Sequence, residues 1–263
     1  MMRIKNKLKN SSTALSVFYT LSMLKDFLLF NFWGLLSNLK WYLSDLSDYK
    51  NQLKLKRNNT IIILQPSLKD RTSTTPLEPV YFYQDTWAAH KIFELKPQHH
   101  YDIGSSAKTI GLISQFVPTT MVDIRPIDLK LNNLYFQKGT ILNLPFENAS
   151  VKSISSLCVV EHIGLGRYGD LVDVLGSEKA IKEIQRVTAP EGIILISVPV
   201  DDENKTYFNS HRAFTREYIL ELFNNCELME EKYIYGNELV DNYSKGKKLG
   251  AGLFMFKMKH IAN

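Results

Sequence analysis

Short apolar runs alternate with helical patterns from Tyr81 onward. Between the last two runs, residues 178–187 (EKAIKEIQRV) repeat apolar side chains at the spacing of an amphipathic helix. Strands and helices that alternate in this way predict an α/β fold with a doubly wound, Rossmann-like parallel sheet. The predicted strands are 100–103, 119–124, 138–142, 151–160 and 192–200.

The N-terminal part has a different pattern. Two uncharged runs, 11–24 and 27–39, flank Lys25 and Asp26. Neither reaches the roughly 18 residues that a membrane span needs. One helix joining them would put both charges near the bilayer centre, at about 3 kcal/mol each. No small-residue cleavage site precedes Lys25, so a secretory signal is not predicted. We expect one or two amphipathic helices with these apolar positions: Leu21, Leu24, Phe27, Leu28, Phe32, Leu35, Leu36 and Leu39.

This extension carries Trp33 and Trp41 among basic residues. It is typical of a helical cap or dimerisation arm, and an alternative is contact with an anionic membrane surface. Residues 58–76 predict a strand fragment followed by a loop. We therefore expect a basic extension over 1–75 and an α/β domain over 76–263.

The charge of the chain is concentrated in that extension. Residues 1–58 hold ten Lys and Arg and three Asp, a net charge of +7, whereas the other 205 residues carry −2. The body therefore lacks the basic surface of a nucleic-acid-binding domain. Cys158 and Cys226 lie apart with no CxxC, so neither a disulfide framework nor a metal site is predicted. A reducing cytoplasm is the expected compartment.

A candidate ligand site follows the first two strands. Parallel sheets bind ligands at the carboxyl ends of their strands. Gly104 follows the first strand, and Asp123 ends the second, 21 residues after Asp102. This is the spacing of an acid that binds ribose hydroxyls, although a turn glycine and a strand-end aspartate are also common structural residues. GxGxxG is absent, which favours a nucleoside ligand without a pyrophosphate.

Several segments of the body resemble class I S-adenosylmethionine-dependent methyltransferases. They are LPFENAS at 144–150, VEHI at 160–163, EIQRV at 183–187 and PEG at 190–192. Within that superfamily, the chain resembles domain of unknown function 268, a family of bacteria and nematodes with some bacterial members among surface-glycan genes. The resemblance extends over 81–259. The segments that carry it are 84–87, 102–105, 123–126, 161–170 and 208–212.

The resemblance implies S-adenosylmethionine as the cofactor. Gly104 and Ser105 would pass under its methionine part, Asp123 would hold the ribose, and Ile124 would face Ile141 or Leu142 across the adenine. The chain departs from the superfamily at Gly139 and Thr140, where an acid often binds the adenine amine, and at Ser105 and Ser106, which replace a second glycine. The predicted cofactor-binding residues are Gln84, Trp87, Asp102, Gly104, Ser105, Asp123, Ile124, Arg125, Thr140, Ile141, Leu142 and Val160.

His162 is the first candidate for a general base, because the ordinary pKa of histidine suits proton abstraction near neutrality. Glu161 would orient it or tune its charge, and His211 is the second candidate. The alternative is that Glu161 and His162 cap a helix or line the cofactor pocket.

The loop 164–170 holds three glycines and several polar side chains, which suggests a lid or an acceptor clamp. Arg167 and Arg212 have the chemistry to bind a phosphate or carboxylate, and ordinary salt bridges are the alternative. Trp87 is either part of a cover over the cofactor or a core residue. The predicted substrate-binding residues are Asp85, Arg167, Tyr168, Asp170, His211 and Arg212.

Together these features predict an S-adenosylmethionine-dependent, O-directed methyltransferase in the cytoplasm. The resemblance alone suggests a sugar or phosphoryl group of a bacterial surface-glycan precursor, of capsule or lipopolysaccharide, as the acceptor. One alternative is a NAD(P)-dependent oxidoreductase, which the missing GxGxxG disfavours. Another is a non-catalytic cofactor-binding scaffold that recruits a partner or a membrane through its basic arm.

Overall fold

The computed structural model of the chain describes residues 21, 31–55, 62–68, 70–125, 127–247 and 249–260. The chain divides into two compact units, Met1–Pro76 and Leu77–Asn263.

In the described part of the N-terminal unit the chain forms a long helix, α3 (Asn31–Leu55). It continues beyond Leu39, the last apolar position named for the predicted helices, and residues 40–55 contain no proline or glycine to stop it. Arg71 returns to this helix: its guanidinium lies 5.1 Å from the ring centroid of Trp41 and 3.5 Å from a carboxylate oxygen of Asp45. Of the residues that the structure describes, no helix has the length and apolarity to cross a bilayer.

Two expectations for this unit have different outcomes. The helix predicted over the first uncharged run lies outside the described residues, apart from Leu21. The strand fragment predicted within 58–76 is wrong where it can be followed, since residues 62–67 form no regular structure. Pro66 interrupts this segment and lacks the N–H that a strand ladder requires.

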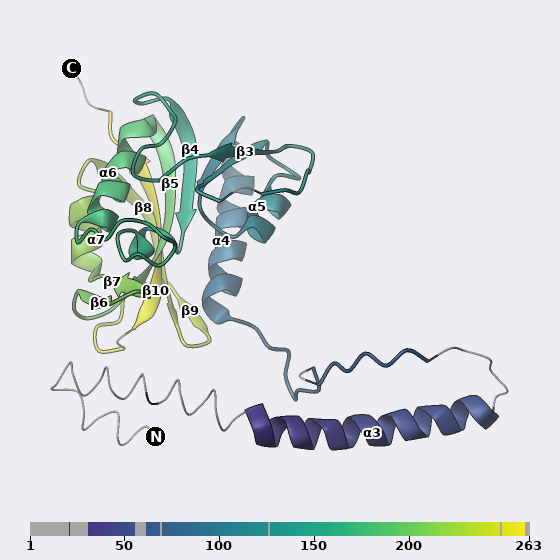
Figure 1. The fold of residues 1–263 in the computed structure, drawn as a ribbon. Helices are drawn as coiled ribbons and strands as arrows, with labels where there is room; N and C mark the ends of the chain where they lie inside the picture. Colours follow the sequence, from purple (N-terminus) through teal and green to yellow (C-terminus); the bar gives the residue numbers. More distant parts are fainter. Residues whose placement is uncertain are drawn as a thin grey trace. The chain divides into compact units, whose positions relative to one another are not determined.

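The C-terminal unit is built on one mixed sheet (Figure 1), with strand order β3-β2-β1-β4-β5-β10-β8-β9. The first five strands are parallel, and β10 runs antiparallel between β5 and β8. This confirms the predicted α/β class with a parallel-dominated sheet. The strands are β1 (His100–Ile103), β2 (Thr119–Asp123), β3 (Leu134–Lys138), β4 (Val151–Leu157), β5 (Thr188–Val200), β8 (Cys226–Tyr235), β9 (Glu238–Val240) and β10 (Gly250–Met258), with β6 (Lys205–Tyr207) and β7 (His211–Ala213) in a separate hairpin.

The third strand lies earlier in the chain than the sequence suggested. β3 ends at Lys138, opposite Asp123 of β2, and residues 138–142 do not continue it. A tight turn follows instead, closed by the N–H of Asn143 on the carbonyl of Thr140 at 3.0 Å. Residues 139–142, at and just before this turn, line the cleft described below.

Helices cover both faces of the sheet. In Figure 1, α4 (Pro79–Leu95) and α5 (Ala107–Ile113) lie on one side, and α6 (Gly176–Val187) and α7 (Arg216–Leu222) lie on the other. Alternate strand side chains enter the two cores: Leu195 packs with the α4 side, whereas its neighbours Ile194 and Ile196 pack with the α6 side.

The start of α4 follows from its sequence. Pro79 occupies the first turn, and the carboxylate of Glu78 accepts the N–H of Val80. This helix brings residues 78–81 to the edge of the site.

Candidate active site

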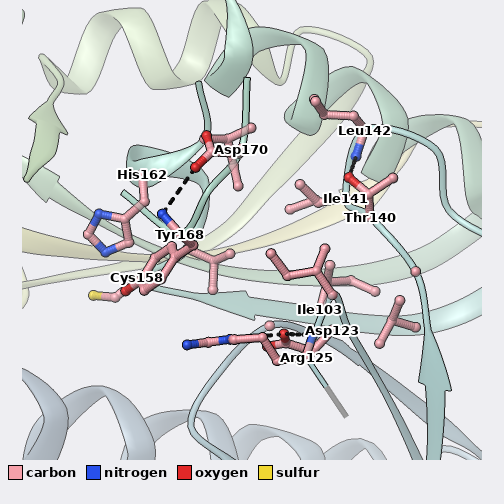
Figure 2. Close-up of a pocket in the computed structure, with 16 residues that line it drawn as sticks. Ile103, Asp123, Arg125, Thr140, Ile141, Leu142, Cys158, His162, Tyr168 and Asp170 are labelled. Atoms are coloured by element: carbon pink, nitrogen blue, oxygen red, sulfur yellow. Dashed lines mark hydrogen bonds and ion pairs between the residues drawn. The ribbon is translucent and has the colours of Figure 1, made fainter. Parts of the chain in front are cut away.

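A cleft of about 680 Å³ opens at the carboxyl ends of β1 to β4 (Figure 2). Of the twelve residues predicted to bind the cofactor, seven line it: Gly104, Asp123, Ile124, Arg125, Thr140, Ile141 and Leu142.

Gly104 leaves the backbone uncovered at the end of β1. Its φ of +72° is strained for any other residue, and a Cβ added here would lie 3.1 Å from Cγ1 of Val159 and 4.0 Å from Oδ2 of Asp123. The glycine therefore keeps space that a side chain would fill, between the β1 loop and the acid at the end of β2.

Asp123 has one carboxylate oxygen held and one free. Oδ1 accepts the backbone N–H of Arg125 at 2.7 Å, which fixes the side chain. Oδ2 accepts no hydrogen bond from the described part of the protein, and the side chain is only 10% exposed. This oxygen is available to a ligand hydroxyl.

An apolar slot continues the cleft beyond Asp123. Ile124 is 41% exposed and Leu142 40% exposed on its walls, while Ile141 is buried between the strands. Thr140 accepts the N–H of Leu142 through its hydroxyl oxygen at 3.3 Å, which leaves its hydroxyl hydrogen for another acceptor. The slot can hold a flat, weakly polar ring with one polar edge.

The other five residues predicted to bind the cofactor do not line the cleft. Asp102 and Ser105 are buried behind the β1 loop, where the hydroxyl of Ser105 donates to Oδ2 of Asp102 at 2.6 Å. Burial raises the pKa of Asp102 to about 6, although donors from Ser105 and Ser155 oppose this shift. Val160 is fully buried in the core.

Gln84 and Trp87 support the site from α4. The amide oxygen of Gln84 accepts the hydroxyl of Ser197 at 2.6 Å and the thiol of Cys158 at 3.0 Å. Trp87 packs in the α4-side core, and its Nε1 donates to Glu230 at 2.9 Å. This arrangement favours the core interpretation of Trp87.

His162 lies where the chain leaves β4. Cys158 adopts a left-handed φ of 52°, and the short 3₁₀ helix η2 (Val160–His162) follows. Nδ1 of His162 lies 2.6 Å from the carbonyl oxygen of Ser210, which can only accept, so Nδ1 carries the hydrogen and Nε2 keeps its lone pair. Burial lowers the pKa of His162 to about 4, so the ring is neutral near pH 7.

Glu161 is almost completely buried beside this ring. Its Oε1 lies 3.7 Å from Nε2 of His162, and its Oε2 has no hydrogen-bond partner. Burial raises the pKa of Glu161 to about 8. The carboxyl group therefore holds its proton near neutrality and adds no negative charge beside the histidine.

The loop that follows η2 covers one end of the cleft. The ring of Tyr168 lies between the guanidinium groups of Arg125, at 4.8 Å, and Arg167, at 5.2 Å. Asp170 accepts the N–H groups of Gly164 and Tyr168, so its carboxylate shapes the loop. Tyr168 and Asp170 both line the cleft, and Figure 2 shows Tyr168 beside His162.

A second, more open hollow adjoins the first and shares Cys158 and His162 with it. Arg167 and His211 line this hollow, together with Glu161. Two residues that the sequence analysis did not assign to the site also line these cavities, Tyr81 and Cys158. The Glu-Pro pair before Tyr81 is a sequence signal for the start of a helix, whereas only the fold brings Cys158 between the two cavities.

Two predicted substrate residues have structural roles instead. Arg212 is buried, and its guanidinium donates to the carbonyl of Ile163 at 2.5 Å, to Oγ of Ser177 at 2.9 Å and to the carbonyl of Asp173 at 3.0 Å. It holds the loop after η2 and presents no free edge to an anion, so the prediction that it clamps the acceptor is not supported. Asp85 accepts the hydroxyl of Thr109 at 2.6 Å and lines neither cavity.

Sequence comparison identifies a family. The family model described as "Caenorhabditis protein of unknown function, DUF268" matches residues 121–253, half of the chain. The chain belongs to this family. No curated protein matches it.

Solved structures resemble the C-terminal unit. A protein from Galdieria sulphuraria, described as a sarcosine dimethylglycine methyltransferase, has 16% identity and a TM-score of 0.51, covering 70% of this chain and 91% of its own. NodS, an N-methyltransferase from Bradyrhizobium japonicum, has 14% identity and a TM-score of 0.49, covering 70% and 98%. The 1,6-didemethyltoxoflavin-N1-methyltransferase from Burkholderia thailandensis, solved with S-adenosylhomocysteine, has 13% identity and a TM-score of 0.48, covering 72% and 94%. The first likeness shows that the chain has the Rossmann-like methyltransferase fold.

Proposed function

We propose that the protein is an S-adenosylmethionine-dependent methyltransferase and that the cleft binds this cofactor. The observation that supports it best is the free Oδ2 of Asp123, which faces the uncovered backbone of Gly104 at the carboxyl ends of β1 and β2. The acid would accept the ribose hydroxyls, and the slot between Ile124 and Leu142 would hold the adenine. The absence of GxGxxG after β1 disfavours a dinucleotide as the ligand.

The chemistry of the neighbouring residues favours an oxygen acceptor. When bound, the cofactor supplies a methyl group on a positively charged sulfur. The task left to the protein is to align a nucleophile and to remove its proton. Neutral His162, with its lone pair on Nε2, has the state that this task requires near pH 7. Burial also lowers the pKa of His211, the second candidate, so that ring is neutral near pH 7 too.

We further propose a small polar acceptor carrying an anionic group, such as a nucleotide-linked sugar or a phosphorylated glycan precursor. Arg167 lines the second hollow and supplies a positive charge there. The bacterial surface-glycan destination, of capsule or lipopolysaccharide, rests on family resemblance alone. The basic extension fits a role in homodimerisation or in contact with the inner face of a membrane, with the enzyme acting in the cytoplasm.

Calorimetric titration tests the cofactor first. S-adenosylmethionine and S-adenosylhomocysteine should bind the purified protein, NAD and NADP should not, and Asp123→Ala should abolish binding. Binding of NAD alone would overturn the proposal and favour an oxidoreductase.

Substitutions of the candidate catalytic residues then separate an enzyme from a scaffold. His162→Ala, Glu161→Ala and His211→Ala should keep cofactor binding, and His162→Ala should lose turnover of nucleotide sugars. Turnover that survives all three changes would overturn the assigned roles.

A further inference from the structure

One residue that lines the second hollow has a buried carboxyl oxygen without a hydrogen-bond partner. Among the residues that the structure describes, two carboxyl oxygens are buried and unpaired, Oε2 of Glu161 and Oε2 of Glu178. Glu178 lines neither cavity, and its other oxygen accepts the hydroxyl of Tyr218 at 2.8 Å. Glu161 lines the second hollow. An unpaired buried polar group costs about 1–3 kcal/mol of stability. A ligand that forms a hydrogen bond with Oε2 of Glu161 would remove this cost, which would add to its binding free energy.

A hydrogen-bond acceptor lies beside this carboxyl group. Nε2 of His162 carries the lone pair, because Nδ1 donates to Ser210, and it lies 3.7 Å from Oε1 of Glu161. His162 borders both cavities, so this nitrogen lies between the proposed cofactor cleft and the second hollow. A ligand in the hollow therefore meets one hydrogen-bond acceptor, Nε2 of His162, beside the carboxyl group of Glu161.

These two groups discriminate between acceptor chemistries. An ionised phosphoryl oxygen has no hydrogen to give, so it would leave Nε2 of His162 unpaired. An ammonium group has hydrogens but meets the positive charge of Arg167, whose Nη1 donates to the carbonyl oxygen of Ser210 at 3.0 Å and lies 3.2 Å from Nδ1 on the same ring of His162. A pair of neighbouring hydroxyl groups carries no charge: one hydroxyl can donate to Nε2 of His162 and the other can pair with the carboxyl group of Glu161. Because a hydroxyl group can both donate and accept a hydrogen bond, it can pair with the carboxyl group of Glu161 whether that group is protonated or ionised.

We propose that the second hollow binds the acceptor through a vicinal diol, with one hydroxyl on Nε2 of His162 and its neighbour on Oε2 of Glu161. This rests on the proposed methyltransferase function and names its substrate class. The hydroxyl on His162 is the one methylated: its oxygen forms the new bond to carbon as the carbon–sulfur bond breaks, the electron pair of that bond stays on sulfur, and the hydroxyl proton moves to Nε2. A hydroxyl of a sugar, and not its phosphoryl oxygen, is then the site of transfer.

Small probes test this inference without the natural acceptor. The protein, with and without S-adenosylhomocysteine, is titrated with cis-1,2-cyclohexanediol, cyclohexanol and methyl phosphate, and the ¹⁵N resonance of Nε2 of His162 reports binding. The diol should bind at least about 10-fold more tightly than cyclohexanol, the ratio expected for one added buried hydrogen bond. Glu161→Leu should reduce the affinity for the diol to that for cyclohexanol and leave cyclohexanol unchanged. Glu178→Leu, at the other unpaired carboxyl group, should leave both unchanged.

Each outcome has a defined meaning. Equal affinity for diol and monool, tighter binding of methyl phosphate, or an unchanged preference in a folded Glu161→Leu variant would overturn the diol site. If Glu161→Leu fails to fold, the affinities for diol and cyclohexanol are compared in Glu161→Gln instead. In the wild type, the infrared band of the Glu161 carboxyl group then gives a second readout, which the diol should shift and cyclohexanol should not. If S-adenosylhomocysteine does not bind but the diol does, the proposed methyltransferase function is overturned and the diol site is not.

Discussion

Ser105 donates its hydroxyl hydrogen to Oδ2 of Asp102 at 2.6 Å, behind the wall of the cleft at the carboxyl ends of β1 to β4. The same hydroxyl oxygen accepts the backbone N–H of Leu157, the last residue of β4, at 2.9 Å. One serine therefore fastens the loop after β1 to the end of β4. This gives a physical reason for a serine where many methyltransferases have a second glycine.

Ser105→Ala should destabilise the protein by about 1–3 kcal/mol, because it leaves a buried carboxyl group short of a donor and a buried N–H without its acceptor. Urea unfolding measures the change. Ser106→Ala is the matched control, since this neighbouring serine makes no capping hydrogen bond with its side chain. Equal losses in the two variants would contradict the role given to Ser105.

Asp123→Asn should weaken binding of S-adenosylmethionine by about 10- to 100-fold, the effect of losing a hydrogen bond to a charged acceptor. The amide keeps the size of the side chain, and calorimetry measures the affinity. Asp241→Asn changes an exposed carboxylate outside both cavities and should leave the affinity unchanged. An Asp123→Asn variant that binds like the wild type would place the ribose elsewhere.

Gly104→Ala should lose both stability and cofactor affinity. The left-handed backbone disfavours any side chain by about 1–2 kcal/mol, and the added Cβ would lie 3.1 Å from Val159. Gly246→Ala separates the two effects, because Gly246 has a φ of +92° with no atom within 4 Å of an added Cβ. We expect Gly246→Ala to lose stability only, as measured by thermal unfolding alongside calorimetry. An unaltered affinity in Gly104→Ala would mean that the ligand does not approach this backbone.

The sequence predicted the parts of this fold that depend on local pattern. The strands that contain Asp102, Asp123 and Ser155 lie within the predicted ranges 100–103, 119–124 and 151–160, and the α6 helix has a clear apolar face. Seven of the predicted cofactor residues line one cleft because motif spacing along parallel strands translates directly into position at the sheet edge.

What the sequence did not predict depends on contacts between distant segments. Arg212 carries a side chain that often binds anions, yet its guanidinium group already donates to four carbonyl and hydroxyl oxygens of the loop and of α6. The partnerless oxygen of Glu161 is equally invisible in sequence, because it depends on which groups from other elements fail to reach it. The shift of β3 to Leu134–Lys138 is decided by pairing with β2.

The stability of Glu161→Gln relative to the wild type should increase as pH rises, because the wild type loses stability that the variant keeps. Burial raises the folded-state pKa of Glu161 from 4.5 to about 8, so the folded chain holds a proton that the unfolded chain has released between these values. Stability from this group is fully present below pH 4.5 and is lost as pH rises through about 8, by up to about 1.4 kcal/mol per pH unit. The amide has no proton to lose, so the variant lacks this slope.

Urea unfolding at a series of pH values between 4.5 and 8 measures this difference. The gain of Glu161→Gln over the wild type should be smallest at the acid end and should grow towards the alkaline end. Glu238→Gln, at a side chain that is 71% exposed, controls for the loss of a carboxylate in general. A constant difference between Glu161→Gln and the wild type over this range would mean that the buried carboxyl group is ionised throughout, and that Oε2 meets its ligand as an anion.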